Sequence, residues 1–403
     1  MKFKFYLLVL FTLGTGLSQI VAESPNPEHL AAAEDGFAFK LLKELAAEQP
    51  VTNIFISPYS AETVLQMVAN GAVGKTKTEM QQVLGTTSLS DDSVNQASQR
   101  IARSLNTGNT NVILTTAKAI WYRQGTPVRP SFLVLNQQFS DATVAPIDFA
   151  DPHSVDIINA WAAEKTHGKI THIADGMIDP LYSRLFLANA VYFKGKWLEP
   201  FDANDTKERP FHLRDGAEKN VPMMTQSKTF TYRHGTGYQA VRLPYQDENL
   251  AMYVFLPETN SRPEKLLSIM SGNTWNRITK PGFSEKEGML MLPRFKMEYS
   301  IEMVKPLKSL GMKLAFDDVN ADFSGIASNL YISAVRQKTY IEVKEEGTEA
   351  VAATAESVQA GGPEPPRPDP FQMIVDRPFL FLIEDNQTGT ILFMGVVFDP
   401  RTD

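Results

Sequence analysis

The sequence predicts an α+β fold in a chain of 403 residues. Helix-like and strand-like hydrophobic patterns mix from end to end, and neither a low-complexity linker nor an internal repeat divides the middle of the chain. Hydrophobic residues make up 43 % and charged residues 21 %, which is ordinary for a globular protein. The strands concentrate in the C-terminal half, so we expect long-range strand pairing rather than a row of small domains.

Composition and motifs exclude several kinds of site. The chain has no cysteine, which rules out disulfides, thiolate zinc sites, cysteine nucleophiles and iron–sulfur clusters. The formal net charge is −7, whereas a surface that coats nucleic acid needs a basic excess. The six histidines form no two-histidine zinc motif, and no nucleophile elbow or dinucleotide fingerprint occurs. We expect no cofactor, no metal and no nucleic-acid partner. A secreted hydrolase with a dispersed catalytic triad remains an alternative.

The N-terminus has the pattern of a secretory signal peptide over residues 1–22. Lys2 and Lys4 precede an apolar run at residues 5–13, and Ala22 is a small residue before a plausible cleavage point. The run is too short to span a bilayer, and no later run is long enough, so we expect no membrane partner. The prediction is a secreted, extracellular protein, or a periplasmic one if the source is bacterial.

Local signals predict the first elements of the mature chain. Residues 53–60 predict a short buried strand that runs into a helix, with Ser57 as N-cap and Pro58 at the first helical position. Apolar residues then recur at helical spacing up to Ala72. Residues 157–169 predict another helix by the same criterion.

Five later segments are mostly apolar runs with β-branched and aromatic side chains, and they predict strands. These are residues 185–193, 251–256, 289–297, 379–383 and 390–397. The first is typical of a buried central strand. The last two flank a polar connection of six residues and therefore predict a β-hairpin.

A long segment between two strand-like regions is the candidate for function. Residues 345–370 are rich first in small side chains and then in proline. Loops this long in a compact domain are usually functional or disordered, and a plain surface linker is the alternative. With a strand period of two, one face would carry Thr348, Ala350, Ala352 and Thr354. A strand with such a face can enter an existing sheet without displacing the core.

The segment that begins at Glu345 resembles the hinge of the reactive-centre loop in serpins, a family of serine protease inhibitors. The resemblance covers essentially the whole mature chain, because further serpin-like motifs occur in the same order. They are residues 53–60, Asn159-Ala160-Trp161 with Thr166, Lys169 and Ile170, residues 189–197 with Phe201, Leu292-Pro293-Arg294-Phe295, Leu310-Gly311-Met312, residues 376–381 and residues 392–395. Several separate motifs in one order make the match specific.

This resemblance implies a single domain over residues 23–403, with three β-sheets, eight to nine helices and an exposed loop at about 345–370. It implies a suicide mechanism, in which a protease cleaves the loop and is trapped as an acyl-enzyme while the loop inserts into the main sheet. The implied partner is a serine protease, or in some members a cysteine protease. We expect a monomer. A non-inhibitory carrier or chaperone on the same fold is the alternative.

The resemblance also implies which residues form the hinge. They are Glu345, Glu346, Gly347, Thr348, Glu349, Ala350, Val351, Ala352, Ala353 and Thr354. Gly347 permits a change of backbone conformation, and no proline lies between Gly347 and Gly362 to interrupt a hydrogen-bond ladder. These features favour an active inhibitor. Glu356 is an exception, since by the same alternation it would face inward.

Counting along the loop places the bait bond. In inhibitory serpins the cleaved residue usually lies fourteen beyond the hinge glycine, which gives Gly361–Gly362 here, with Ala360 as a neighbouring choice. Small residues suit an elastase-like or subtilisin-like protease. Arg367 is the second choice and would imply a trypsin-like target, although it lies too far along the loop and precedes a proline.

A sheet-opening cluster is implied as well, and Ser57, Ser60 and Asn189 match it. Gln337 stands where the family usually has a histidine. Glutamine can donate and accept hydrogen bonds but cannot titrate, so we expect no pH-dependent gating there. No helix has an obvious basic face, so we expect no polyanion cofactor. Asn204 and Asn386 begin N-glycosylation sequons, which have meaning only in a eukaryotic secretory route.

Overall fold

The computed structural model describes residues 27–105, 111–247, 249–348 and 369–400. These residues form nine α-helices and fifteen β-strands, which confirms the α+β fold class. The predicted signal peptide, the bait bond and most of the predicted hinge lie outside the described residues.

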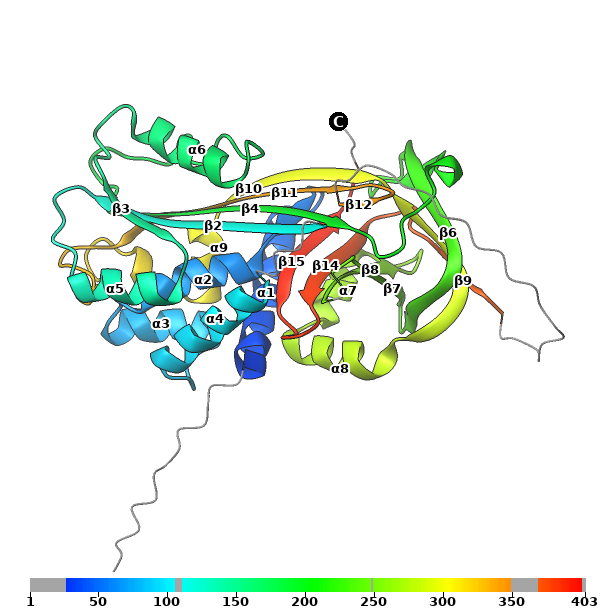
Figure 1. The fold of residues 1–403 in the computed structure, drawn as a ribbon, viewed down its shortest axis with the longest axis horizontal. Coiled ribbons are helices and arrows are strands. Elements are labelled where there is room, and N and C mark those ends of the chain that lie inside the picture. Colours follow the sequence, from blue (N-terminus) through cyan, green and yellow to red (C-terminus); the bar gives the residue numbers. More distant parts are fainter. Residues whose placement is uncertain (1–26, 106–110, 248, 349–368, 401–403) are drawn as a thin grey trace, which may run out of the picture.

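The helices cover both faces of a long sheet, and most of them lie on one face (Figure 1). Helix α6 lies alone on the opposite face. The helices are α1 (Pro27–Glu48), α2 (Pro58–Ala69), α3 (Gly74–Leu84), α4 (Asp91–Leu105), α5 (Pro130–Phe139), α6 (Ser154–Lys165), α7 (Pro263–Ile269), α8 (Gly272–Gly282) and α9 (Val304–Leu310).

The long sheet has six strands in the order β10-β11-β4-β2-β3, with the short strand β12 also paired to β4. Its strands are β2 (Val112–Arg123), β3 (Thr143–Ile147), β4 (Leu185–Lys196), β10 (Phe295–Glu302), β11 (Ile332–Val343) and β12 (Gly347–Thr348). Strand β4 is central and almost completely buried, as its apolar sequence predicts. It pairs antiparallel with β2 and parallel with β11.

The second sheet has nine strands in the order β1-β15-β14-β8-β7-β6-β9-β13, with β5 also paired to β6. Its strands are β1 (Ile54–Ile56), β5 (Lys207–His212), β6 (Glu218–Gly235), β7 (Tyr238–Pro244), β8 (Leu250–Pro257), β9 (Ser284–Pro293), β13 (Phe371–Ile374), β14 (Phe379–Asp385) and β15 (Ile391–Val397). The start of β6 pairs with β5 and its end pairs with β7. Two of the three implied sheets are therefore continuous along β6 in the described residues.

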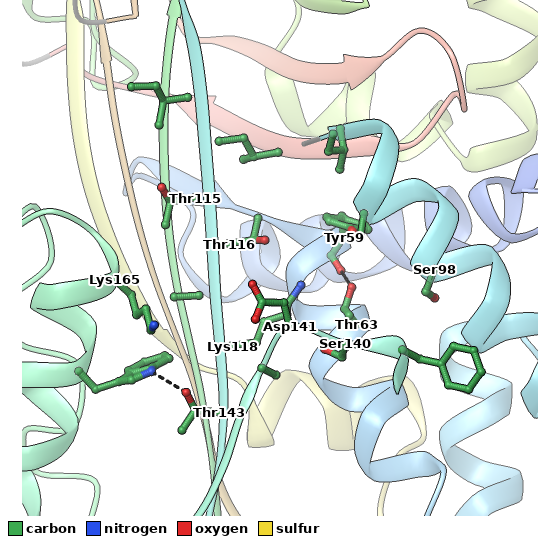
Figure 2. A pocket seen from close by; sticks show the side chains of 18 of the residues that line it. Tyr59, Thr63, Ser98, Thr115, Thr116, Lys118, Ser140, Asp141, Thr143 and Lys165 are labelled. Atoms are coloured by element: carbon green, nitrogen blue, oxygen red, sulfur yellow. Dashed lines mark hydrogen bonds between the residues drawn. The ribbon is translucent and has the colours of Figure 1, made fainter. Parts of the chain in front are cut away.

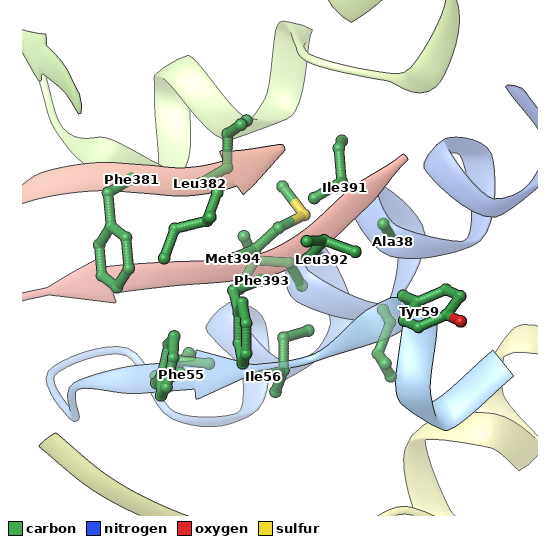
Figure 3. Close-up of a cluster of buried hydrophobic side chains, with 14 of the residues drawn as sticks. Ala38, Phe55, Ile56, Tyr59, Phe381, Leu382, Ile391, Leu392, Phe393 and Met394 are labelled. Atoms are coloured by element: carbon green, nitrogen blue, oxygen red, sulfur yellow. The ribbon is translucent and has the colours of Figure 1, made fainter. Parts of the chain in front are cut away.

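Aromatic side chains join the two sheets at the centre of the core, where the ring centroid of Phe193 in β4 lies 5.4 Å from that of Phe393 in β15. Phe55 of β1 stacks on Phe393 and Phe381 of the β14–β15 hairpin, with ring centroids 5.2 and 5.7 Å apart (Figure 3). On the other face of the long sheet, Trp121 and Trp161 pack edge to face at 6.4 Å and attach α6. Burial of each such ring contributes about 2–3 kcal/mol to the free energy of unfolding.

The predicted strand–helix junction and the predicted hairpin are both confirmed. Strand β1 ends at Ile56, and the Ser57 hydroxyl caps α2 by accepting the Ser60 N–H. Strands β14 and β15 pair antiparallel as the sequence predicts.

Two predicted boundaries are wrong. The predicted strand at residues 289–297 is divided at Arg294, because β9 belongs to the nine-stranded sheet and β10 to the six-stranded one. The predicted helix at 157–169 begins at Ser154 and ends at Lys165. The Thr166 hydroxyl donates to the Ala162 carbonyl and accepts the Ile170 N–H, which terminates the helix.

Candidate functional site

The candidate site is the seam between β4 and β11. These parallel strands pair from Leu185 opposite Ile332 to Tyr192 opposite Tyr340, and pairing stops there. Beyond this point β12 runs antiparallel along β4, with Gly347 opposite Lys196 and Thr348 opposite Gly195. The sheet is therefore already divided at one end, and the first hinge residues lie in the division.

Gly347 makes this entry into the sheet sterically feasible. Its φ is +138°, a region that side chains disfavour, and reciprocal hydrogen bonds with Lys344 close a tight turn. A Cβ atom added there would lie 2.1 Å from the Gly195 carbonyl oxygen. Only glycine fits this close approach of two backbones.

Glu345 attaches the turn to the neighbouring sheet through a partly buried ion pair. Glu345 is 3 % exposed, and the Arg294 Nε donates to its two carboxylate oxygens at 2.7 and 2.9 Å. The Thr206 hydroxyl donates to the same carboxylate. Burial opposes ionisation, but the hydrogen bonds from Arg294 and Thr206 outweigh it and hold the pKa of Glu345 below its usual value.

Thr348 is completely buried against an aromatic pair. Its hydroxyl lies 3.3 Å from that of Tyr245, whose ring stacks on Trp197 at a centroid distance of 4.6 Å. The Trp197 indole donates to the Lys344 carbonyl at 3.0 Å, and its backbone N–H donates to the Glu346 carbonyl at 2.9 Å. The hinge thus has specific partners before any cleavage.

The four residues of the predicted sheet-opening cluster lie together halfway along the seam. The Gln337 side chain accepts the Ser57 N–H and donates to the Ser57 carbonyl and the Asn189 side-chain oxygen, each at 2.9 Å. The Asn189 amide in turn donates to the Ser60 hydroxyl at 2.6 Å. All four are at most 1 % exposed. The cluster therefore connects both seam strands to the N-terminus of α2.

Sequence reasoning missed several partners of these residues. Thr206, Trp197 and Tyr245 support the hinge, and Thr339 donates its hydroxyl to the Phe55 carbonyl beside the cluster. Arg294 was found only as part of a motif. Its partner Glu345 is 51 positions away and could not be assigned without the fold.

The remaining predicted site residues lie outside the described part of the chain. They are Glu349, Ala350, Val351, Ala352, Ala353, Thr354, Glu356, Ala360, Gly361, Gly362 and Arg367. No described helix is long and apolar enough to cross a membrane. Within the described ranges no cluster of histidine and carboxylate side chains could hold a metal ion.

Comparison with known proteins gives one consistent result. The family model described as "Serpin (serine protease inhibitor)" matches residues 32–400. Serpin B6 of Pongo abelii is 39 % identical over 383 residues, covering 92 % of this chain and 99 % of the relative. Human glia-derived nexin is 32 % identical over 407 residues, covering 98 % of this chain and 99 % of the relative.

Comparison with solved structures gives the same family. Native protease nexin-1 with heparin superposes with a TM-score of 0.83 at 31 % identity, covering 93 % of this chain and all of that one. The native thermophilic serpin tengpin gives a TM-score of 0.83 at 29 % identity, covering 92 % of this chain and 94 % of that one. The fold and the seam define an inhibitor that acts on proteases rather than an enzyme. The chain belongs to the serpin family of serine protease inhibitors.

Replacing Gln337 tests the cluster. In Gln337→Ala the Ser57 N–H and the Asn189 side-chain oxygen lose their buried partner, so we expect a loss of about 3 kcal/mol in the free energy of unfolding. Urea denaturation measures it, and Gln372→Ala, at an exposed glutamine of β13, is the control. Equal stability of the two variants would contradict the role of the cluster.

Glu345 should give the stability a specific pH dependence. A carboxylate with a lowered pKa contributes stability that is present above its unfolded pKa of about 4.3 and is lost as pH falls through the lower folded value. Arg294→Met should therefore be least stable relative to wild type near pH 7, and the difference should shrink below about pH 4. Arg209→Met, at an exposed arginine of β5, should show no such trend. A constant difference across this range would refute the assignment.

Proposed function

We propose that this protein is a secreted suicide inhibitor of serine proteases with elastase-like or subtilisin-like specificity. The observation that carries the proposal is the division of the β4–β11 seam, with Gly347 and Thr348 already lying in it. A loop strand that starts there can continue along the seam if β4 and β11 separate.

The register of β12 supports an assignment of the residues that would follow. Since Thr348 lies opposite Gly195, an antiparallel continuation would place residues 348–358 along the full length of β4. The successive pairs would be Ala350 with Phe193, Ala352 with Val191 and Thr354 with Asn189. Paired residues of adjacent strands point to the same face, and Phe193 and Val191 belong to the main core. Small side chains would therefore face the core side.

The inserted strand would be more stable than the open loop. Separating the parallel seam breaks its existing hydrogen bonds, but a strand between β4 and β11 forms ladders on both of its edges. The net gain is on the order of ten hydrogen bonds at about 1 kcal/mol each. This gain would drive the motion that traps the protease.

The chemistry of the trap begins with ordinary proteolysis at Gly361–Gly362. The protease serine hydroxyl attacks the Gly361 carbonyl carbon, an ester to the enzyme forms, and the Gly362 nitrogen leaves as an amine. Insertion of the loop would then carry the ester-linked protease along the sheet before water can hydrolyse the ester. The small residues at the bond favour a protease with a shallow primary pocket.

Export from the cell is part of the proposal. The charged start and short apolar run of residues 1–22 support cleavage after Ala22. N-terminal sequencing of exported protein should begin at Glu23. Protein that starts at Met1 and stays inside the cell would contradict this part.

A non-inhibitory carrier or chaperone is the second candidate, and Glu356 favours it. The same register places Glu356 opposite Leu187, which is completely buried. Burying an unpaired carboxylate there would cost several kcal/mol or require its protonation. Insertion past this position would be slowed or stopped.

A protease panel decides between the two candidates. With elastase-like and subtilisin-like enzymes we expect a complex that survives denaturation, because its link is a covalent ester. Mass spectrometry should then find a released fragment that begins at Gly362. A fragment that begins at Pro368 would shift the assignment to Arg367 and a trypsin-like target. Cleavage without any complex would support the carrier.

Glu356 predicts an improvement by mutation. In Glu356→Ala the inward carboxylate is gone, so the fraction of protease that ends in covalent complex should rise at the expense of cleaved, released inhibitor. The matched control is Glu349→Ala, because alternation places Glu349 on the outer face. Complex and cleaved product are quantified by denaturing electrophoresis. An equal effect of the two substitutions would contradict the proposed register.

A further inference from the structure

A cavity of about 680 Å³ lies beside β2, away from the seam. Strand β2 pairs with β4 along nearly its whole length, but with β3 only from Ala119 onward. The preceding residues of β2 therefore have one edge along which the described part of the chain places no strand, and this edge lines the cavity. Helices α2 and α4 and the segment at 139–143 supply other parts of the wall (Figure 2).

Lys118 is the unusual residue of this wall. It is only 6 % exposed, and its side chain lies among the cavity-lining residues Tyr59, Thr63 and Asp141 (Figure 2). Its ammonium group lies 5.8 Å from the centre of the Tyr59 ring. No residue of the described ranges gives this ammonium group a hydrogen bond or an ion pair within 4 Å. A buried cation is costly unless it is paired, so an unpaired one in a cavity wall indicates an external anion.

The titratable groups around Lys118 leave room for that anion. Burial lowers the pKa of Lys118 to about 8, while Asp141 and Glu62 oppose the shift, so the amine is mainly protonated at pH 7. Glu62 is fully buried on α2, and burial raises its own pKa to about 7. Glu34 on α1 has a raised pKa for the same reason. Asp141 is exposed to solvent at the rim. None of these carboxyl groups neutralises Lys118 by direct contact.

The rest of the wall indicates an amphiphilic molecule. Leu105, Val112, Leu114 and Phe139 provide apolar surface. Ser98 lines the same cavity, and its buried hydroxyl has no hydrogen-bond partner among the described residues. One buried cation, one free hydroxyl and apolar walls match a carboxylate on a short hydrocarbon body.

We propose that this cavity binds a small organic carboxylate with an apolar chain, with the carboxylate paired to Lys118 and the chain against the apolar residues of α4 and β2. The site goes beyond the proposed inhibition of proteases, because it uses none of the hinge or seam residues.

Binding of three probes with the same chain length tests the proposal. Octanoate, octanol and octylammonium are titrated into the full-length protein by calorimetry at pH 7. We expect octanoate to bind at least about tenfold more tightly than octanol, and octylammonium to bind more weakly than both. Equal affinities for octanoate and octanol would overturn the proposal, as would the absence of octanoate binding.

Two variants locate the site, and a third serves as the control. Lys118→Met keeps the length of the side chain and should reduce octanoate affinity to that of octanol. Ala102→Trp, at the exposed Ala102 of α4, should block octanoate while leaving Lys118 in place. Lys165→Met removes a rim lysine that is already near Glu164 at 3.7 Å, and should leave binding unchanged. Full octanoate affinity in Lys118→Met would refute the assignment.

The pH dependence gives a readout that needs no variant. Octanoate affinity should fall as pH rises through about 8, where Lys118 loses its proton, whereas octanol affinity should stay constant. A flat octanoate profile up to pH 10 would contradict a role for Lys118. Covalent complex formation with a protease is measured in a separate experiment. A negative result for octanoate binding would therefore not contradict the proposed inhibition of proteases, and a failure to form the complex would not contradict the carboxylate site.

Discussion

The parallel pairing of β11 with β4 is the interaction on which the rest of the structure depends. It joins two strands that are far apart in the sequence, and a strand added between them could pair with both neighbours in antiparallel orientation. The seam is divided beyond Tyr192 and Tyr340. If it accepts a strand as proposed, the present arrangement of the sheet would not be its most stable one.

Two sets of contacts control this seam from different positions. At the divided end, Glu345, Gly347 and Thr348 are held by an ion pair, a close backbone approach and an aromatic stack. Halfway along it, Gln337 and Asn189 bind each other and the start of α2. In the proposed insertion the middle contacts would have to break, whereas the end contacts would guide the incoming strand. The contacts that stabilise the seam and those that would start the insertion therefore belong to different groups of residues.

The sequence alone predicts much of this arrangement, but only where the signal is local. The Ser57 cap, the central strand β4 and the final hairpin follow from capping, burial and alternation, and the motifs placed Gln337 beside Asn189. The division of residues 289–297 was missed, because a continuous apolar pattern does not reveal that Arg294 moves the chain from one sheet to the other. The Glu345–Arg294 pair and the unpaired Lys118 were missed for a related reason: charge partners, and their absence, are set by the tertiary structure.

The most direct test of the central claim is thermal unfolding before and after the loop is cut. A non-target protease should cleave within 349–368 without forming a complex. If the cut loop inserts, a gain of about 10 kcal/mol should raise the unfolding midpoint by about 12 °C for a domain of this size. An unchanged midpoint after complete cleavage would show that the seam does not accept the loop, and would contradict the account.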